Sequence, residues 1–231
     1  MSGGRPGVLV LVAGTGTEVG KTWVSARLLE AWRRAGLTAA ARKPAQSFDP
    51  GTGPTDAEVL AAASGERPEQ VCPPGRSYPV ALAPPMAADA LGLVPPTVAE
   101  LASELSWPDG VDVGVVESAG GVRSPQADDG DVVELARALD PDAVVLVADA
   151  GLGTINAVRL AVGALAGAAR PGRGALPVVV VLNRFDAGTD LHGRNHAWLA
   201  GRDGLDVVPG DPAGLALLAT RLAVPARAGA G

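Results

Sequence analysis

A glycine-rich stretch near the start of the chain constrains its fold more than any other feature. An apolar run, Val8 to Ala13, leads into Gly14-Thr15-Gly16-Thr17-Glu18-Val19-Gly20-Lys21-Thr22, where a segment with helical spacing begins. A buried strand, a glycine turn and Gly-Lys-Thr at a helix start form the context of a phosphate-binding loop. The free N–H groups and partial positive charge of a helix N-terminus attract phosphate oxygens, and glycines let the backbone curl around them.

The spacing within this loop departs from the common pattern by one residue. Four residues normally separate the first glycine from the Gly-Lys pair, but here Thr15 takes that first position and Gly14 lies one residue earlier. A glycine turn that binds no ligand is the alternative interpretation. We favour a phosphate site, in which the Lys21 ammonium reaches the outer phosphates of a nucleotide and the Thr22 hydroxyl binds Mg²⁺.

The composition agrees with an α/β fold and excludes several kinds of site. The 231 residues are 47% hydrophobic but only 3% aromatic, so Ala, Val and Leu must fill the core, as in a parallel sheet covered by helices. The net charge of −6 offers no basic surface to nucleic acid. The single cysteine, Cys72, excludes an internal disulfide and a zinc site built from cysteines. His192 and His196 lie four residues apart without an evident third ligand, so we expect two solvated side chains.

Lysine usage singles out two positions. Of the 19 lysine and arginine residues, only Lys21 and Lys43 are lysines. An ammonium group is a compact charge on a flexible stem, whereas guanidinium is a wide planar fork, and a tight phosphate or carbamate pocket favours the former. Chance survival of two surface lysines is the alternative. Because Lys21 falls within the glycine loop, we infer that Lys43 also belongs to the site.

Strand and helix patterns alternate along the chain. The predicted strands are 8–13, 37–42, 111–116, 143–148, 176–182 and 205–208, and the main predicted helices are 21–35, 56–63, 97–105, 131–139, 190–200 and 212–222. The alternation predicts a single P-loop-type α/β domain over residues 1–231, with a mostly parallel, doubly wound sheet and helices on both faces. The proline-rich segment 66–85 predicts an irregular excursion over the sheet, a candidate substrate-covering loop, and Trp23 and Trp32 are expected to be packing residues rather than ligand stackers.

Polar groups follow several predicted strands, which is where open α/β sheets bind ligands. Lys43 ends the second strand and is kept extended by Pro44. Glu117 follows the third strand and precedes small residues, a pattern that would face Mg²⁺ and the γ-phosphate; a solvated turn is the alternative. Asp56 starts a helix capped by Thr55, where it either binds Mg²⁺ or compensates the helix dipole.

Two other segments are candidate ligand contacts. Ser47, in the loop after Lys43, either faces a ligand or hydrogen-bonds within its own turn. Segment 149–156 is a second glycine turn that enters a helix, and it forms another candidate anion site. No apolar run is long enough to be a targeting or membrane segment, so we expect a cytoplasmic protein without a membrane partner.

Taken together, these motifs resemble those of the dethiobiotin synthetase family. The resemblance rests on residues 14–22, Lys43-Pro44 with Ser47, Thr55-Asp56-Ala57, Val116-Glu117-Ser118-Ala119-Gly120-Gly121, Leu152-Gly153-Thr154-Ile155-Asn156, and Asn183. It covers residues 8 to about 185 in the family's order and is thin beyond them. The family's phosphate loop carries the same extra residue.

The resemblance implies an ATP-dependent ring closure in biotin biosynthesis. The family converts 7,8-diaminononanoate, CO₂ and ATP into dethiobiotin, ADP and phosphate. A carbamate forms on one substrate amine and takes the γ-phosphoryl group of ATP, which gives a mixed anhydride. The second amine then attacks, closes the ureido ring and expels phosphate. This chemistry needs mainly positioning and charge neutralisation from the protein.

The resemblance also implies roles for individual residues. Lys21 and Lys43 would be the catalytic groups, Ser47 would contact the diamine or carbamate, and Thr22, Asp56 and Glu117 would hold Mg²⁺. The nucleotide would contact Thr17, Glu18, Val19, Gly20, Lys21, Thr22, Trp23, Asp56, Glu117, Ser118, Ala119, Gly120, Asn183, Arg184, Pro209 and Gly210. A homodimer is implied, in which the helix start at Gly153, Thr154, Ile155 and Asn156 binds the carboxylate of substrate held by the other subunit.

Two departures and two alternatives accompany this resemblance. The family usually has Gly where Ser118 stands, so the hydroxyl of Ser118 is expected to crowd or hydrogen-bond the phosphate. Arg184 after Asn183 is not the commonest choice, which leaves adenine selectivity open. One alternative is a switch ATPase of the partitioning type, disfavoured because Lys21 is the only lysine in the loop. The other is a related ligase or amidotransferase with another substrate.

Overall fold

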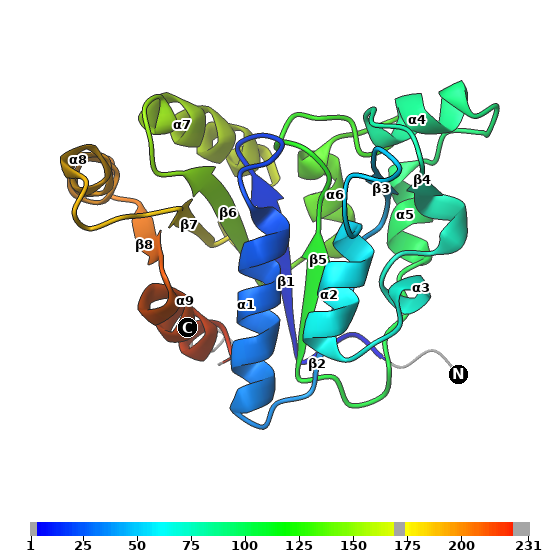
Figure 1. Cartoon of the computed structure of the whole chain (residues 1–231), viewed down its shortest axis with the longest axis horizontal. Helices are drawn as coiled ribbons and strands as arrows, with labels where there is room; N and C mark the ends of the chain where they lie inside the picture. Colours follow the sequence, from blue (N-terminus) through cyan, green and yellow to red (C-terminus); the bar gives the residue numbers. More distant parts are fainter. Residues whose placement is uncertain (1–3, 169–173, 224–231) are drawn as a thin grey trace.

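The computed structural model describes residues 4–168 and 174–223, and it shows one central sheet between two layers of helices (Figure 1). The main sheet has six parallel strands in the order β2-β5-β1-β6-β7-β8. Their bounds are β1 Val8–Gly14, β2 Ala39–Arg42, β5 Val113–Glu117, β6 Ala143–Asp149, β7 Val178–Asn183 and β8 Asp206–Gly210. Since β1 lies inside the sheet and the chain extends from it in both directions, the predicted doubly wound parallel sheet is confirmed.

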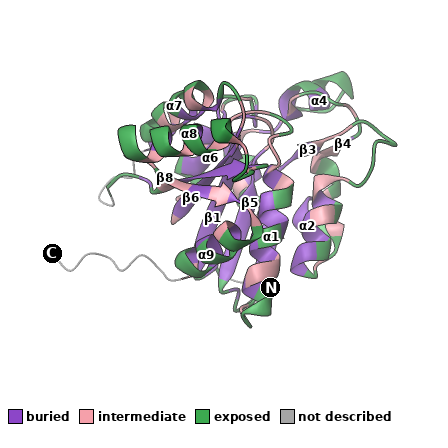
Figure 2. Ribbon diagram, turned by 60° about the vertical axis from the view of Figure 1, so that its left-hand side comes forward, coloured by how far each residue is buried: buried purple, intermediate pink, exposed green. Residues whose placement is uncertain are grey.

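Alternating side chains of the strands build the two halves of the core. Val8, Val10 and Val12 of β1 face one side, together with α1 (Lys21–Arg34), α2 (Asp56–Ser64) and α9 (Pro212–Leu222). The residues between them face α6 (Val132–Leu139) and α7 (Thr154–Leu165) on the other side. Figure 2 shows the strands buried between these layers and the outer helix faces exposed. This alternation of buried apolar residues is what fixes the strand register.

A small subdomain of short elements lies beside the carboxyl edge of the sheet. It contains a two-stranded parallel sheet and several short helices, namely β3 Gln46–Ser47, α3 Pro68–Val71, η1 Pro74–Arg76, β4 Ser77–Tyr78, α4 Pro84–Ala90 and α5 Val98–Ser103. Tyr78, Ala87, Ala88 and Leu101 form its own buried apolar cluster. The predicted irregular excursion is therefore more ordered than the prolines suggested, because its alanines and leucines bury a separate small core.

The remaining elements lie between β6 and the last helix. They are η2 Ala166–Ala168, α8 Asp190–Ala197 and the π-helical turn η3 Trp198–Arg202. The α-helix predicted over 190–200 thus ends earlier, at Ala197. His192 and His196 are half-buried and flank the Phe185 ring at 6.0 Å between ring centroids, so they are only partly solvated.

The two tryptophans of α1 have different surroundings. Trp32 is buried and its indole N–H donates to the Ala219 carbonyl at 2.8 Å, as expected for a packing residue. Trp23 is 41% exposed, and its ring lies 5.9 Å from the Arg27 guanidinium. The prediction that Trp23 is a packing residue is wrong, because its position in the first turn of α1 faces away from the sheet.

The register of the sheet brings the strand ends to one edge. Val12 of β1 pairs with Glu117, and the last residue of β6, Asp149, pairs with Asn183. Asn183 in turn pairs with Gly210 at the end of β8. The loops that follow these strands therefore share one rim of the molecule.

None of the helices in the described ranges is both long and apolar enough to cross a membrane.

Candidate active site

The loop between β1 and α1 has a backbone that its sequence makes possible. Gly20 caps α1 in the left-handed conformation, with φ of 92°. A Cβ at this position would lie 2.0 Å from Nδ2 of Asn183, which donates to the Val19 carbonyl at 2.9 Å. Only glycine satisfies both the dihedral angle and the close approach. The loop is thereby held with the N-terminus of α1 open to an anion.

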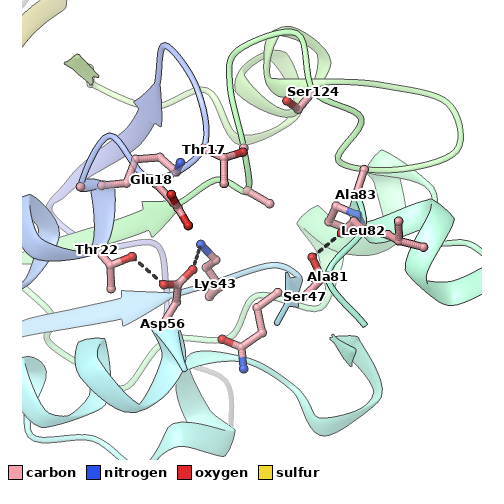
Figure 3. Close-up of a pocket in the computed structure, with 16 residues that line it drawn as sticks. Thr17, Glu18, Thr22, Lys43, Ser47, Asp56, Ala81, Leu82, Ala83 and Ser124 are labelled. Atoms are coloured by element: carbon pink, nitrogen blue, oxygen red, sulfur yellow. Dashed lines mark hydrogen bonds and ion pairs between the residues drawn. The ribbon is translucent and has the colours of Figure 1, made fainter. Parts of the chain in front are cut away.

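A buried lysine stands between two carboxylates beside this loop. Nζ of Lys43 lies 2.6 Å from Oδ2 of Asp56 and 2.7 Å from Oε1 of Glu117. Lys43 is 1% exposed and Glu117 is fully buried, whereas Asp56 reaches the cavity from the first turn of α2. Figure 3 shows Lys43, Asp56 and Thr22 grouped on one side of the cavity. Three elements that are distant in sequence thus supply one charged cluster.

Hydroxyl groups of α1 complete this cluster. Oγ1 of Thr22 lies 2.7 Å from Asp56 and 2.9 Å from Glu117, and its single proton serves one of them at a time. Ser25, one turn further along α1, donates to the other oxygen of Glu117 at 2.7 Å. Ser25 was not predicted, although its spacing of three from Thr22 places both on neighbouring faces of one helix. Both oxygens of the buried Glu117 are therefore satisfied.

The lysines of the site differ in their pKa values. Burial, reinforced by the positive charge of Lys43, lowers the pKa of Lys21 to about 8. Burial alone would also lower the pKa of Lys43, but the charges of Glu117 and Asp56 outweigh it and hold that pKa above its ordinary value. Burial opposes ionisation of Asp56, yet Lys43 keeps its pKa below the usual range. Lys43 is thus a permanent cation at neutral pH, whereas the pKa of Lys21, about 8, lies close to neutral pH.

We expect the affinity for ADP to depend on the charge of Lys21. Below pH about 8 the ammonium is protonated and attracts phosphate, and above it the affinity will fall by up to about tenfold for each pH unit. Calorimetric titration with ADP between about pH 7 and pH 10 measures this change. An affinity that stays flat over this interval would show that phosphate binding does not need the charge of Lys21.

The cluster opens into a cavity of about 620 Å³ (Figure 3). Ten of the predicted site residues line it: Thr17, Glu18, Gly20, Lys21, Thr22, Lys43, Ser47, Asp56, Ala119 and Gly120. Gln46 and Ser124 also line it and were not predicted, and Ala81, Leu82, Ala83 and Pro84 come from the end of segment 66–85, which was expected to pass over this region. The four consecutive residues 81–84 form an apolar wall, which Figure 3 shows across from the charged cluster.

Two polar side chains fix the geometry of this wall and of α2. Ser47 lines the cavity, and its hydroxyl donates to the Leu82 carbonyl, 35 residues away, so the alternative of a hydrogen bond within its own turn is wrong. Oε1 of Gln46 accepts from the N–H of Ala57 at 2.9 Å. Thr55 caps α2 as predicted, in a reciprocal capping box with Glu58. Asp56 is consequently aimed at Lys43 by the residues on both sides of it.

Ser118 does not point toward the phosphate loop opening. Its side chain is buried, and its hydroxyl donates to the Val12 carbonyl at 3.3 Å. The expectation that this hydroxyl crowds or binds a phosphate is therefore wrong. Side chains alternate along an extended strand, and Glu117 takes the side that faces the cluster, so Ser118 turns into the sheet.

The predicted base-reading residues lie outside the cavity lining. Asn183 is buried and holds Val19, while the Arg184 guanidinium donates to the Glu18 carbonyl at 2.7 Å and to Asp149 at 2.8 Å. Pro209 and Gly210, together with Val19, Trp23 and Ser118, are also absent from this lining. The second glycine turn, with Gly153, Thr154, Ile155 and Asn156, starts α7 on the opposite side of the phosphate loop.

The oxygen groups of the cluster fit a magnesium ion. Thr22, Asp56 and Glu117 offer one hydroxyl and two carboxylates, and the hydroxyl lies within hydrogen-bonding distance of both carboxylates. No group of three or more His, Cys, Asp and Glu side chains suited to a metal occurs in the described ranges. Mg²⁺ does not require one, because it binds through one or two carboxylates and takes further ligands from phosphate and water.

Comparison with known proteins shows which family this sequence matches. A family model described as an AAA domain matches residues 9–208. The ATP-dependent dethiobiotin synthetase of Rhodococcus jostii is 43% identical over 69% of this chain and 68% of its own length. The enzymes of that name from Anaeromyxobacter dehalogenans and Haloferax mediterranei are each 38% identical, over 88% and 89% of this chain and 90% and 84% of their own lengths.

Solved structures with the same fold are more distant in sequence. The signal recognition particle receptor FtsY of Elizabethkingia anophelis aligns with a TM-score of 0.54 and 16% identity, over 96% of this chain and 67% of its own. The chloroplast FtsY of Physcomitrella patens gives a TM-score of 0.51 and 16% identity, over 94% of this chain and 66% of its own. Such identities show a shared fold only. The chain has the phosphate loop and the cluster of lysines and acids, and its relatives match most of its sequence. It therefore belongs to the dethiobiotin synthetase family.

Proposed function

We propose that this chain catalyses the ATP-dependent closure of the ureido ring of dethiobiotin from 7,8-diaminononanoate and CO₂. The observation that carries the proposal is the placement of Lys43 beside the phosphate loop, where one buried cation adjoins the acids of the site and lines the same cavity as the apolar wall. The family provides the substrates, since its members are ATP-dependent dethiobiotin synthetases. A switch ATPase of the partitioning type would carry its second lysine within the phosphate loop, whereas here the second lysine, Lys43, follows β2.

The phosphate loop would hold the triphosphate of ATP. The open N–H groups at the start of α1 favour negative charge, and Lys21 lies next to them with Nζ 3.1 Å from the Gly16 carbonyl. When phosphate oxygens replace that carbonyl as its partner, the nearby negative charge will raise the pKa of Lys21 and keep it protonated. Lys21 thereby neutralises the charge that moves with the γ-phosphoryl group.

Lys43 would stabilise the carbamate and the mixed anhydride. The carbamate oxygen bonds to the γ-phosphorus while the bond to the ADP oxygen breaks. The second amine then bonds to the carbamate carbon, loses a proton and expels phosphate. Both steps move negative charge past Nζ of Lys43, whose position is fixed by Asp56 and Glu117. A fixed cation needs no reorganisation during the reaction, which is the main source of its effect.

The residues present fit a role for Mg²⁺ in this reaction. Thr22, Asp56 and Glu117 would hold the ion, which when bound neutralises the β- and γ-phosphate oxygens. Asp56 is the more accessible of the two acids, so it is the one that can exchange its bond to Lys43 for a metal bond without burying an unpaired charge.

Changing Asp56 to asparagine will weaken the binding of the Mg²⁺ ion that supports nucleotide binding. The amide keeps a hydrogen bond to Thr22 but loses the charge that attracts the ion, so we expect about a 10- to 100-fold higher Mg²⁺ concentration for half-maximal effect. ADP calorimetry at a series of Mg²⁺ concentrations measures this directly, without turnover. Asp49→Asn, an exposed acid in the preceding loop, is the matched control. An unchanged Mg²⁺ dependence in Asp56→Asn would remove Asp56 from the metal site.

We also propose a homodimer in which the start of α7 completes the other subunit's site. Gly153 leaves the N-terminus of α7 without a side-chain cap, so its N–H groups can donate hydrogen bonds to a carboxylate. Leu152 and Leu160, beside and on α7, are exposed apolar side chains of the kind that subunit interfaces cover. Because the reaction consumes ATP, we place the protein in the cytoplasm.

The proposal is tested by mixing purified protein with ATP and Mg²⁺, adding the diamine and bicarbonate singly and together. We expect rapid ADP release only when both are present, with a product of the mass of dethiobiotin. ADP release that needs neither would favour a switch ATPase. Release with another amine but not with the diamine would favour the related ligase.

A further inference from the structure

Arg184 joins two parts of the site that are distant in sequence. It follows β7, and its guanidinium donates to the Glu18 carbonyl of the phosphate loop at 2.7 Å and to Oδ2 of Asp149 at 2.8 Å. The other oxygen of Asp149 accepts from the N–H of Gly151 at 2.8 Å. A continuous path of hydrogen bonds thus runs from the phosphate loop to the turn that starts α7.

The backbone conformations at both ends of the first bond are unusual. Glu18 and Arg184 adopt left-handed conformations, with φ of 60° and 56°. Such conformations are unfavourable for residues with a Cβ and persist where the surroundings fix them. Here the two strained residues are hydrogen-bonded to each other. The contact is therefore part of how the loop is shaped, because either residue could relax if the bond were absent.

The turn before α7 is fixed from its other side as well. Asn195 of α8 is 6% exposed, and its amide donates to the carbonyls of Ala150 and Gly151 at 2.9 and 3.0 Å. The N–H of Ala150 donates to the Asn183 carbonyl. These bonds hold the Ala150 and Gly151 carbonyls. The link from this turn to the phosphate loop is the pair Asp149 and Arg184, which joins the Gly151 N–H to the Glu18 carbonyl.

Because Arg184 and Asp149 are exposed, their effect on the shape of the loop can be tested apart from the stability of the fold. The side chains of Arg184 and Asp149 are both about half exposed. Exposed ion pairs contribute little to the free energy of unfolding, because water screens them. Removing this pair should therefore leave the fold intact while freeing the Glu18 carbonyl, so an effect on ligand binding is separable from unfolding.

We propose that Arg184 is a positioning residue that couples the phosphate-binding loop to the turn before α7, so that nucleotide binding orders that turn. Arg184 thereby acts on the loop rather than by reading the base. The inference deepens the proposed function and rests on it in one respect: the turn begins the helix that we assign to the substrate carboxylate. Nucleotide in one subunit would then prepare the carboxylate site that this subunit presents to its neighbour.

The test combines ADP calorimetry with hydrogen exchange of the amides of residues 150–154. In the native chain, ADP will slow exchange in this turn. In Arg184→Ala, we expect the Kd for ADP to rise about 5- to 20-fold and the protection of the turn to be lost. Arg184→Lys should also lose the protection, because one ammonium cannot reproduce the planar fork that reaches both partners. Unfolding temperatures of all variants should match that of the native chain.

The control is Arg194→Ala, which removes another exposed arginine, paired with Asp190 within α8. It should keep native ADP affinity and protection. Equal protection of residues 150–154 in Arg184→Ala, or no protection in a native chain that binds ADP, would overturn the coupling. A native chain that shows the protection but forms no dethiobiotin would instead reject the proposed function and leave the coupling standing.

Discussion

Exchanging Lys43 for arginine is expected to lower turnover by about 100-fold or more while the protein stays folded. Nζ of Lys43 fits between Asp56 and Glu117 at 2.6 and 2.7 Å, in a site where the side chain is 1% exposed. A guanidinium carries the same charge but is wider and planar, so it cannot keep both contacts and still face the transferring phosphoryl group. Steady-state rates with the diamine, bicarbonate and ATP measure the loss.

The choice of arginine keeps this result interpretable. Removing the charge altogether would leave the buried Glu117 unpaired and is expected to destabilise the fold by about 3–5 kcal/mol. Arginine avoids that cost, and thermal unfolding of Lys43→Arg checks it. Arg34→Lys, at an exposed pair with Glu30 on α1, is the matched exchange and should change neither rate nor stability. Near-native turnover of Lys43→Arg would contradict the role given to this lysine.

Gly20→Ala should nearly abolish nucleotide binding, raising the Kd for ADP by about 100-fold or more. The added Cβ meets Nδ2 of Asn183 at 2.0 Å, so the Asn183 amide must leave the Val19 carbonyl and the loop must move. The left-handed φ of 92° adds about 1–2 kcal/mol of backbone strain. Calorimetry with ADP and thermal unfolding report the two effects separately.

A substitution at Gly36 separates the steric clash with Asn183 from the backbone strain of a positive φ. Gly36, after α1, has φ of 83°, and a Cβ there would meet nothing within 4 Å. Gly36→Ala should therefore cost only the strain, about 1 kcal/mol, and leave ADP affinity unchanged. If Gly20→Ala behaves like Gly36→Ala in both measurements, the close packing of Asn183 on the loop does not shape the site.

The sequence was sufficient to predict the parts of the site that depend on local pattern. Strand, glycine turn and helix start locate the phosphate loop, and the residues after the strands locate Lys43 and Glu117. Because parallel strands end at one edge, these groups were expected to meet, and the register brings them together. Thr55 as an N-cap likewise predicted where Asp56 begins α2.

Other features depend on long-range packing and could not be read from the chain. Ser118 turns away from the cavity because the strand alternation is set by Glu117, which one sequence does not reveal. Trp23 is exposed because the burial of α1 depends on which neighbours cover it. Asn183 and Arg184 act on the phosphate loop, more than 160 residues away in the chain, and no local motif predicts such a partner.

The most direct test of the account follows the oxygen atoms of ¹⁸O-labelled bicarbonate in a single short incubation with ATP, Mg²⁺ and the diamine. If a carbamate oxygen attacks the γ-phosphorus, the inorganic phosphate released will carry one labelled oxygen and the ureido carbonyl of dethiobiotin will carry another. Phosphate without label, formed while ADP is released, would contradict the mixed anhydride and with it the central role proposed for Lys43.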